Sequence, residues 1–182
     1  TGPVAFLSQS GGMAIDLAHL GKWLGLRFSK VVSFGNGADL REAELLRYLA
    51  DDSETGVISL YVEGVADGAD FFAALREAAR RKPVVIYKGG LSEAGGRAVV
   101  GHTASMGGSR AIWSGVLRQV NAVQVHDLEE LAQACLAFSL LPARAFRGIS
   151  AVGGGGALGA AAADAAEVRG LAMPAFSPSL RG

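Results

Sequence analysis

Several features are scarce in this chain, and each absence excludes a class of protein. The 182 residues include one cysteine, Cys135, so no internal disulfide can form, as is usual for a protein of the reducing cytoplasm. Basic and acidic residues number 17 each without long runs of either sign, which argues against a nucleic-acid or anionic-membrane surface. No apolar run is long enough to span a bilayer. With 50% hydrophobic and 19% charged residues, a globular protein is expected.

Glycine, in contrast, is abundant. The 26 glycines are about twice the usual share, which is about 7%. Many of them cluster where apolar segments give way to helical patterns, at residues 11–12, 35–37, 89–90, 95–96, 107–108 and 153–156. This distribution indicates an enzyme whose backbone approaches its ligands closely.

Apolar strands alternate with helical patterns over the first 141 residues. We expect strands at 4–7, 30–34, 57–62, 84–87 and 123–125, and helices at 12–25, 41–49, 70–81, 109–120 and 128–140. The continuous apolar run at residues 4–7 is typical of a parallel sheet that is buried on both faces. Because parallel strands need crossover connections, this order predicts a doubly wound α/β domain over residues 1–141.

The pattern restarts after a boundary at Pro142-Ala143-Arg144. We expect a strand at 148–152, followed by four glycines and an alanine-rich helix at 157–168. One such unit cannot bury its own hydrophobic faces. Residues 146–182 are therefore expected to open a second α/β domain, and the chain to be an excerpt of a longer polypeptide.

Two strand-to-helix junctions are candidate phosphate sites. Ser10, Gly11 and Gly12 stand where a strand ends and a helix begins, and a helix N-terminus offers unpaired amides and a positive dipole end to an anion. The alternative is that Ser10 is an ordinary N-cap. Gly154, Gly155 and Gly156 occupy a similar junction. The glycines there fit a dinucleotide fingerprint, but residues 171–180 lack the carboxylate that such a site needs, which favours a second phosphate site.

His102 and Glu63 are the candidate catalytic residues. His102 lies among small residues at 101–108, so a bulky anion can reach its ring, and a ring nitrogen could accept a transferable phosphoryl group. Glu63 ends an apolar strand, where its carboxylate could fix the imidazole tautomer and stabilise the phosphorylated ring. In each case the alternative is a solvated side chain without a role. We assign no role to His19 or His126, and expect Cys135 to be a buried thiol.

Five segments, taken in order, resemble the NDP-forming acyl-CoA synthetases, the superfamily of succinyl-CoA synthetase and ADP-forming acetyl-CoA synthetase. The resemblance covers essentially the whole chain. Each motif is weak alone, but five in order are quite specific. The segments are Ser8-Gln9-Ser10-Gly11-Gly12, Ser33-Phe34-Gly35-Asn36-Gly37-Ala38-Asp39, Tyr61-Val62-Glu63-Gly64, the Lys-Pro-Val strand at 82–90, and His102-Thr103.

The resemblance implies a flavodoxin-like ligase domain at 1–141 and the start of a similar domain at 146–182. It implies that His102 is phosphorylated, that Glu63 contacts it, and that helix ends at Ser10–Gly12 and Gly154–Gly156 hold the phosphate. The implied reaction converts acyl-CoA, phosphate and ADP or GDP into acid, CoA and ATP or GTP, through an acyl phosphate and the phosphohistidine. One departure is Ala104, where the family often has glycine.

The resemblance also implies what the complete enzyme requires. CoA and ATP/ADP or GTP/GDP with Mg would be substrates, bound by CoA-binding and ATP-grasp domains or by a second subunit. No tightly bound cofactor or resident metal is expected in this chain. Two alternatives stay open: a non-catalytic regulatory module, as in ligase-like domains fused to protein acetyltransferases, and citrate or malate cleavage by a related domain. The presence of both His102 and Glu63 favours an enzyme.

Overall fold

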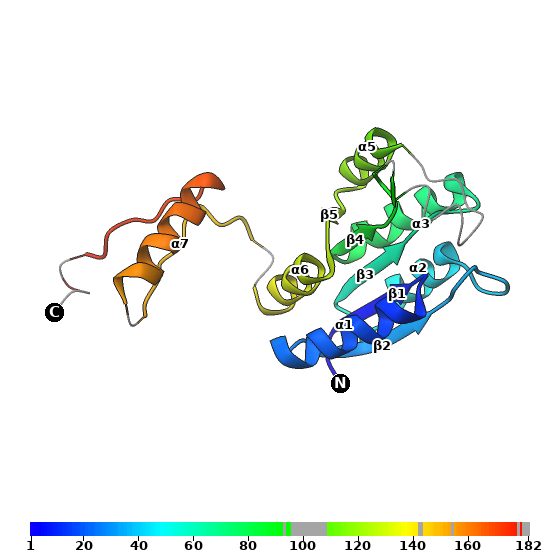
Figure 1. Cartoon of the computed structure of the whole chain (residues 1–182), viewed down its shortest axis with the longest axis horizontal. Helices are drawn as coiled ribbons and strands as arrows, with labels where there is room; N and C mark the ends of the chain where they lie inside the picture. The colour runs from blue at the N-terminus through cyan, green and yellow to red at the C-terminus, as the bar shows by residue number, and fades with distance from the viewer. Residues whose placement is uncertain (93, 96–108, 142–143, 154, 178, 180–182) are drawn as a thin grey trace. The chain divides into compact units, whose positions relative to one another are not determined.

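The computed structural model consists of two compact units, Thr1–Leu141 and Pro142–Gly182 (Figure 1). It describes residues 1–92, 94–95, 109–141, 144–153, 155–177 and 179. The two units are taken separately below. No helix in these ranges is both long enough and apolar enough to cross a membrane.

The first unit is built on a parallel sheet. In the described residues the sheet has five strands in the order β2-β1-β3-β4-β5, and every pairing is parallel. This is the order of flavodoxin-like doubly wound folds, so the predicted fold class is confirmed. The strands are β1 (Val4–Ser8), β2 (Phe28–Ser33), β3 (Val57–Val62), β4 (Val84–Lys88) and β5 (Val123–Val125).

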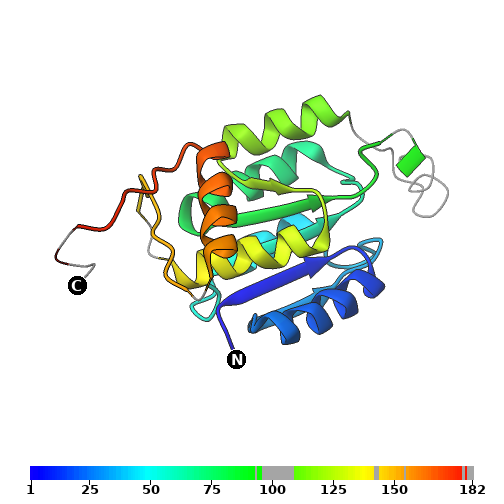
Figure 2. The same cartoon turned by 60° about the vertical axis from the view of Figure 1, so that its left-hand side comes forward.

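Helices cover both faces of this sheet (Figure 2). On one face, α1 (Gly11–Leu24) and α6 (Leu128–Leu140) bury residues such as Phe6 and Leu17. On the other face, Leu7 and Leu60 pack with α2 (Glu42–Asp51), α3 (Gly68–Arg81) and α5 (Arg110–Val120). Neighbouring residues of β1 thus point into different cores, which explains why residues 4–7 are all apolar.

Helix α6 has the predicted bounds, whereas capping residues move some other helix ends by one or two residues. Helix α1 ends at Leu24, because Gly25 adopts the left-handed conformation with φ of +78°. Helix α3 begins at Gly68, two residues before the predicted start. The reason is that the Asp67 carboxylate accepts hydrogen bonds from the N–H groups of Ala69 and Asp70, both 3.0 Å long.

The second unit contains α7 (Gly156–Val168) and one parallel bridge between Gly148 and Ala172. The bridge is made by Ile149 N donating to Ala172 O at 2.9 Å and Ala172 N donating to Arg147 O at 3.0 Å. The predicted strand at 148–152 is therefore wrong beyond this single bridge. The reason is that the segment around Ala172 pairs with residues 147–149 at one bridge only, and no described segment pairs with residues 150–152. Of the described residues in this unit, Ala166 alone is buried.

We expect the fold of the first unit to depend on its central strand. Leu60 is fully buried on β3, so Leu60→Ala should lower the free energy of unfolding by about 2–5 kcal/mol, because it leaves a cavity. Ile15 is 59% exposed on α1, so Ile15→Ala should change this free energy by less than about 0.5 kcal/mol. Urea unfolding followed by circular dichroism measures both variants. Equal effects would contradict the assignment of this core.

Candidate functional site

Three strand ends meet at the carboxyl edge of the sheet. Strand β3 lies between β1 and β4, with Tyr61 in register with Ser8 on one side and Tyr87 on the other. Past these pairs, Gln9 N donates to Tyr61 O and Gly89 N donates to Val62 O, both at 3.0 Å. The predicted residues Ser10 and Glu63 therefore follow adjacent strands at this edge of the sheet, where α/β folds bind their ligands.

Glu63 is held there by side chains from three strand ends. Its main-chain N–H donates to Gln9 Oε1 at 2.6 Å, and the N–H of Gly64 donates to the same oxygen at 3.1 Å. Lys88 Nζ donates to the Glu63 carbonyl oxygen at 2.6 Å. The Tyr61 hydroxyl donates to Glu63 Oε1 at 3.0 Å. The backbone and the carboxylate of Glu63 are thus both restrained, which suits a carboxylate that must meet a partner in one geometry.

Packing against neighbouring groups holds Tyr61 in contact with the Glu63 carboxylate. Its ring meets that of Tyr87 edge-on, with 5.1 Å between the centroids. Burial, together with the charge of Glu63, raises the pKa of Tyr61 well above its usual range, so its hydroxyl remains a proton donor. A Cβ atom at Gly89 would lie 2.7 Å from this hydroxyl. A side chain at position 89 would therefore force Tyr61 to shift.

Lys88 brings a positive charge into the interior beneath this edge. The residue is 2% exposed, and its Nζ donates to the carbonyl oxygens of Glu63 and Gly89. The ammonium lies 5.3 Å from the centroid of the Trp113 ring, within the range of a cation–π interaction. Burial lowers the pKa of Lys88, and the charge of Glu63 opposes this effect.

Ser10 caps helix α1, as the N-cap interpretation predicts. Its Oγ accepts a bond from Met13 N at 3.4 Å, while the Ser8 hydroxyl donates to Ser10 O at 2.6 Å. The two residues that open the helix, Gly11 and Gly12, are exposed. An N-cap and a phosphate site are compatible here, because the cap uses the amide of Met13 and the exposed first turn presents the positive end of the helix dipole.

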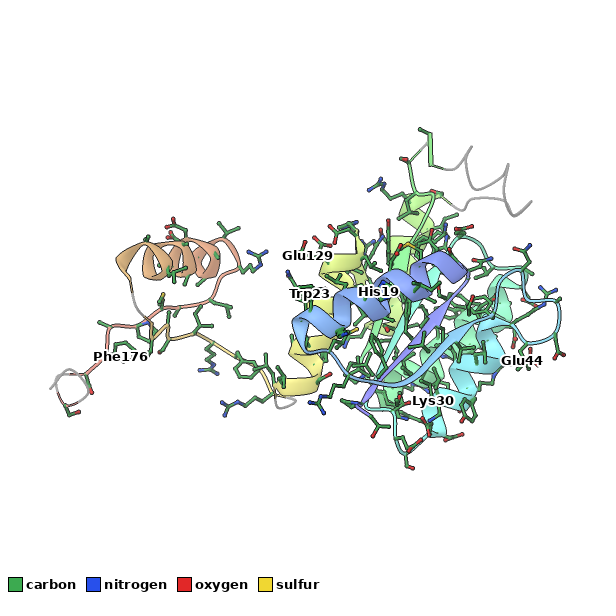
Figure 3. The ribbon with its side chains drawn as sticks, turned by 60° about the horizontal axis from the view of Figure 1, so that its bottom comes forward. His19, Trp23, Lys30, Glu44, Glu129 and Phe176 are labelled. Atoms are coloured by element: carbon green, nitrogen blue, oxygen red, sulfur yellow. The ribbon has the colours of Figure 1, made fainter. Side chains whose placement is uncertain are left out.

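The other candidate residues are placed less completely. Gly155 has φ of +144° and immediately precedes Gly156, the first residue of α7 in the second unit. Gly154 and His102 lie outside the described residues. His19, to which no role is assigned, is exposed along α1 together with Trp23 (Figure 3). Among the described residues, no group of three or more histidine, cysteine or acidic side chains could hold a metal ion.

A pocket of about 370 Å³ opens beyond the ends of β4 and β5. Its polar lining includes Lys88, Ser92, Arg110 and His126. His126, to which no role is assigned from the sequence, directly follows the apolar strand 123–125, and this position places it at the carboxyl edge. Gln9, Tyr61 and Lys88 occur in the sequence motifs, but no pattern in the sequence assigns them a role of their own. Their contacts with Glu63 depend on which strands are neighbours, and no local pattern reveals that order.

Comparison with known proteins identifies relatives of this chain. Residues 1–138 match the family model described as the succinyl-CoA ligase like flavodoxin domain. The chain is 40% identical over 176 residues to acetate–CoA ligase [ADP-forming] I of Archaeoglobus fulgidus, covering 97% of this chain and 25% of the relative. It is 36% identical over 170 residues to acetate–CoA ligase [ADP-forming] I subunit alpha of Pyrococcus furiosus, covering 93% and 37%.

A solved structure is similar over the whole chain. It is the dinucleotide forming acetyl-coenzyme A synthetase 1 of Ca. Korarchaeum cryptofilum in complex with phosphate and ADP, with a TM-score of 0.87 and 32% sequence identity. The match covers 100% of this chain and 39% of that one. The chain thus spans between a quarter and two fifths of the length of these relatives.

We expect Gly89→Ala to disturb the contact between Tyr61 and Glu63. The new methyl would lie 2.7 Å from the Tyr61 hydroxyl oxygen and 3.1 Å from Cζ, so the variant should lose about 1–3 kcal/mol of unfolding free energy. Tyr61→Phe removes the closest atom, so in that background the loss caused by Gly89→Ala should be smaller. Urea unfolding of the two single variants and the double variant measures this coupling.

Gly68→Ala is the matched control, because a Cβ atom there has no neighbour within 4 Å. It should leave the unfolding free energy within about 0.5 kcal/mol of the parent value. Additive effects of Gly89→Ala and Tyr61→Phe would contradict the close approach of these two residues.

Proposed function

Since this chain belongs to the family of succinyl-CoA ligase like flavodoxin domains, we propose that it is the phosphoryl-carrying portion of an NDP-forming acyl-CoA synthetase. The observation that carries the proposal is the restraint of Glu63 at the carboxyl edge of the sheet by Gln9, Tyr61 and Lys88. The relatives that match most of this chain support it, because they are named as ADP-forming acetate–CoA ligases.

In the proposed reaction, phosphate displaces CoA from acyl-CoA and forms an acyl phosphate and free CoA. A ring nitrogen of His102 then attacks the phosphorus, and the acid leaves as its carboxylate. Phospho-His102 finally passes its phosphoryl group to ADP or GDP, which gives ATP or GTP and regenerates the imidazole. Glu63 accepts a hydrogen bond from the other ring nitrogen, so the proton stays there and the attacking nitrogen is unprotonated. The carboxylate charge also offsets the positive charge on the phosphorylated ring.

Helix ends provide the proposed binding sites for the phosphoryl group. The first turn of α1, with Ser10, Gly11 and Gly12, would hold its oxygens through backbone amides and the helix dipole. Gly154, Gly155 and Gly156, before α7, are proposed as the second such site. Support comes from the related acetyl-coenzyme A synthetase, whose solved structure is described as a complex with phosphate and ADP.

The remaining substrates are assigned to the rest of the enzyme. CoA and the nucleotide with its Mg would be bound by CoA-binding and ATP-grasp domains, in the same polypeptide or in a second subunit. The small share of each relative that this chain covers supports that division. No tightly bound cofactor is proposed for this chain, and a cytoplasmic location is proposed. The alternative of a regulatory module gains no support from the relatives reported above, which are named as ligases and synthetases.

We expect His102→Ala to abolish phosphorylation. The complete enzyme, with its nucleotide-binding part, is incubated with labelled ATP or GTP, and label that is acid-labile and stable to alkali is measured. The parent should become labelled and His102→Ala should not, because the accepting nitrogen is gone. His19→Ala is the control, since His19 is exposed on α1 and has no role. A parent enzyme that stays unlabelled both with ATP and with GTP would overturn the proposal.

We expect Glu63→Gln to slow this phosphorylation about 10- to 100-fold, because a neutral amide cannot balance the charge of an imidazolium ring. The variant should remain folded, since an amide oxygen can still accept the hydrogen bond of the Tyr61 hydroxyl. Rapid-quench measurement of the labelling rate tests this expectation. An unchanged rate would remove Glu63 from the mechanism.

A further inference from the structure

Lys88 carries a buried positive charge and has no step of its own in the proposed reaction. The residue is 2% exposed, and it forms no ion pair with a carboxylate among the residues that the structure describes. Removing an ammonium group from water is costly unless its protons are bonded. Here they are bonded to backbone carbonyl oxygens, those of Glu63 and Gly89.

These contacts complete the restraint on Glu63. The main-chain N–H of Glu63 is bound by Gln9 at 2.6 Å, and its carboxylate is bound by Tyr61 at 3.0 Å. Its carbonyl oxygen is bound by Lys88 at 2.6 Å. Without Lys88 the peptide unit after Glu63 would lose the donor to its carbonyl oxygen and would keep only the 3.1 Å bond from Gly64 N–H to Gln9 Oε1, so it could shift. The carboxylate would then move relative to anything that it contacts.

We propose that Lys88 is a positioning residue for Glu63: its ammonium holds the Glu63 carbonyl, and thereby keeps the carboxylate where the phosphoryl-accepting imidazole meets it. The inference rests on the proposed function, since it assigns Lys88 an effect on phosphorylation. In this role Lys88 acts through Glu63 and not on the substrate directly. Its contribution to the rate should therefore depend on the presence of the Glu63 side chain.

Lys82 offers a close comparison on the same segment of chain. Its Nζ donates to Leu49 O at 2.6 Å and to Asp52 O at 2.5 Å, and burial lowers the pKa of Lys82 as it does that of Lys88. Lys82 precedes β4 and Lys88 ends it, so the two lysines bond carbonyl pairs at opposite edges of the sheet. A purely structural role would be common to both residues. An effect on phosphorylation belongs to Lys88 alone.

The test is a double-mutant cycle on the complete enzyme. Lys88→Met and Lys82→Met are each made in the parent and in Glu63→Ala, and the single-turnover rate of His102 labelling is measured at several nucleotide concentrations. Lys88→Met should lower the maximal rate at least about tenfold in the parent, because small displacements of a catalytic group have effects of this size. The half-saturating nucleotide concentration should not change.

In the Glu63→Ala background, Lys88→Met should change the rate less than about threefold, because the carboxylate that it positions is absent. Lys82→Met should leave the rate unchanged in both backgrounds. If Lys88→Met does not fold, Lys88→Gln, which keeps a neutral donor, is measured in its place. It should show a smaller loss that also disappears in Glu63→Ala.

Two outcomes overturn the inference while the proposed function stands: a parent-like rate in the Lys88 variant, or an equal loss in both backgrounds. A parent enzyme that acquires no label on His102 overturns the proposed function and this inference together. The two failures are distinguished by the parent, which is measured first.

Discussion

The parallel pairing of β3 with β1 and β4 is the constraint on which the candidate site depends. Because all these strands run in one direction, their carboxyl ends meet at one edge, and Gln9, Glu63 and Lys88 follow or end them. Successive residues of a strand point to opposite faces of the sheet. A shift of one residue in the register of β3 would therefore move Tyr61 and Glu63 together to the other face and break the contacts of Glu63 with Gln9 and Lys88.

The sequence predicts the elements of this fold more completely than it predicts the site. Hydrophobic patterns predicted the five strands of the first unit, because β1, β3 and β4 are largely apolar and the shorter apolar stretches of β2 and β5 lie between helical patterns. The end positions of Ser10 and Glu63 followed from the same pattern. The contacts of Gln9 and Lys88 with Glu63 could not be predicted in this way, because the two residues lie 54 and 25 positions from Glu63 in the chain. Such contacts follow from the order of the strands, which periodicity does not contain.

The prediction of a strand at 148–152 was wrong for a different reason. The segment has a strand-like sequence but lacks a neighbouring strand along most of its length among the described residues. Its apolar residues have the right composition for a strand, but a strand exists only where another segment accepts and donates its backbone bonds. In the second unit Ala172 provides this at one point, and pairing stops there. In the first unit every predicted strand has neighbours, so composition and pairing agree.

The ladder between β3 and β4 also explains why a lysine is suited to the end of β4. Its last register pair joins Val62 to Lys88, so the carbonyl of Glu63 lies beyond the ladder. A partly buried carbonyl at that point needs a donor that the backbone no longer supplies. Lysine carries three donors on a flexible stem, and one ammonium can serve both Glu63 and Gly89. Lys88 thereby supplies a donor to two backbone carbonyl oxygens and, in the proposed role, also keeps the Glu63 carboxylate in place.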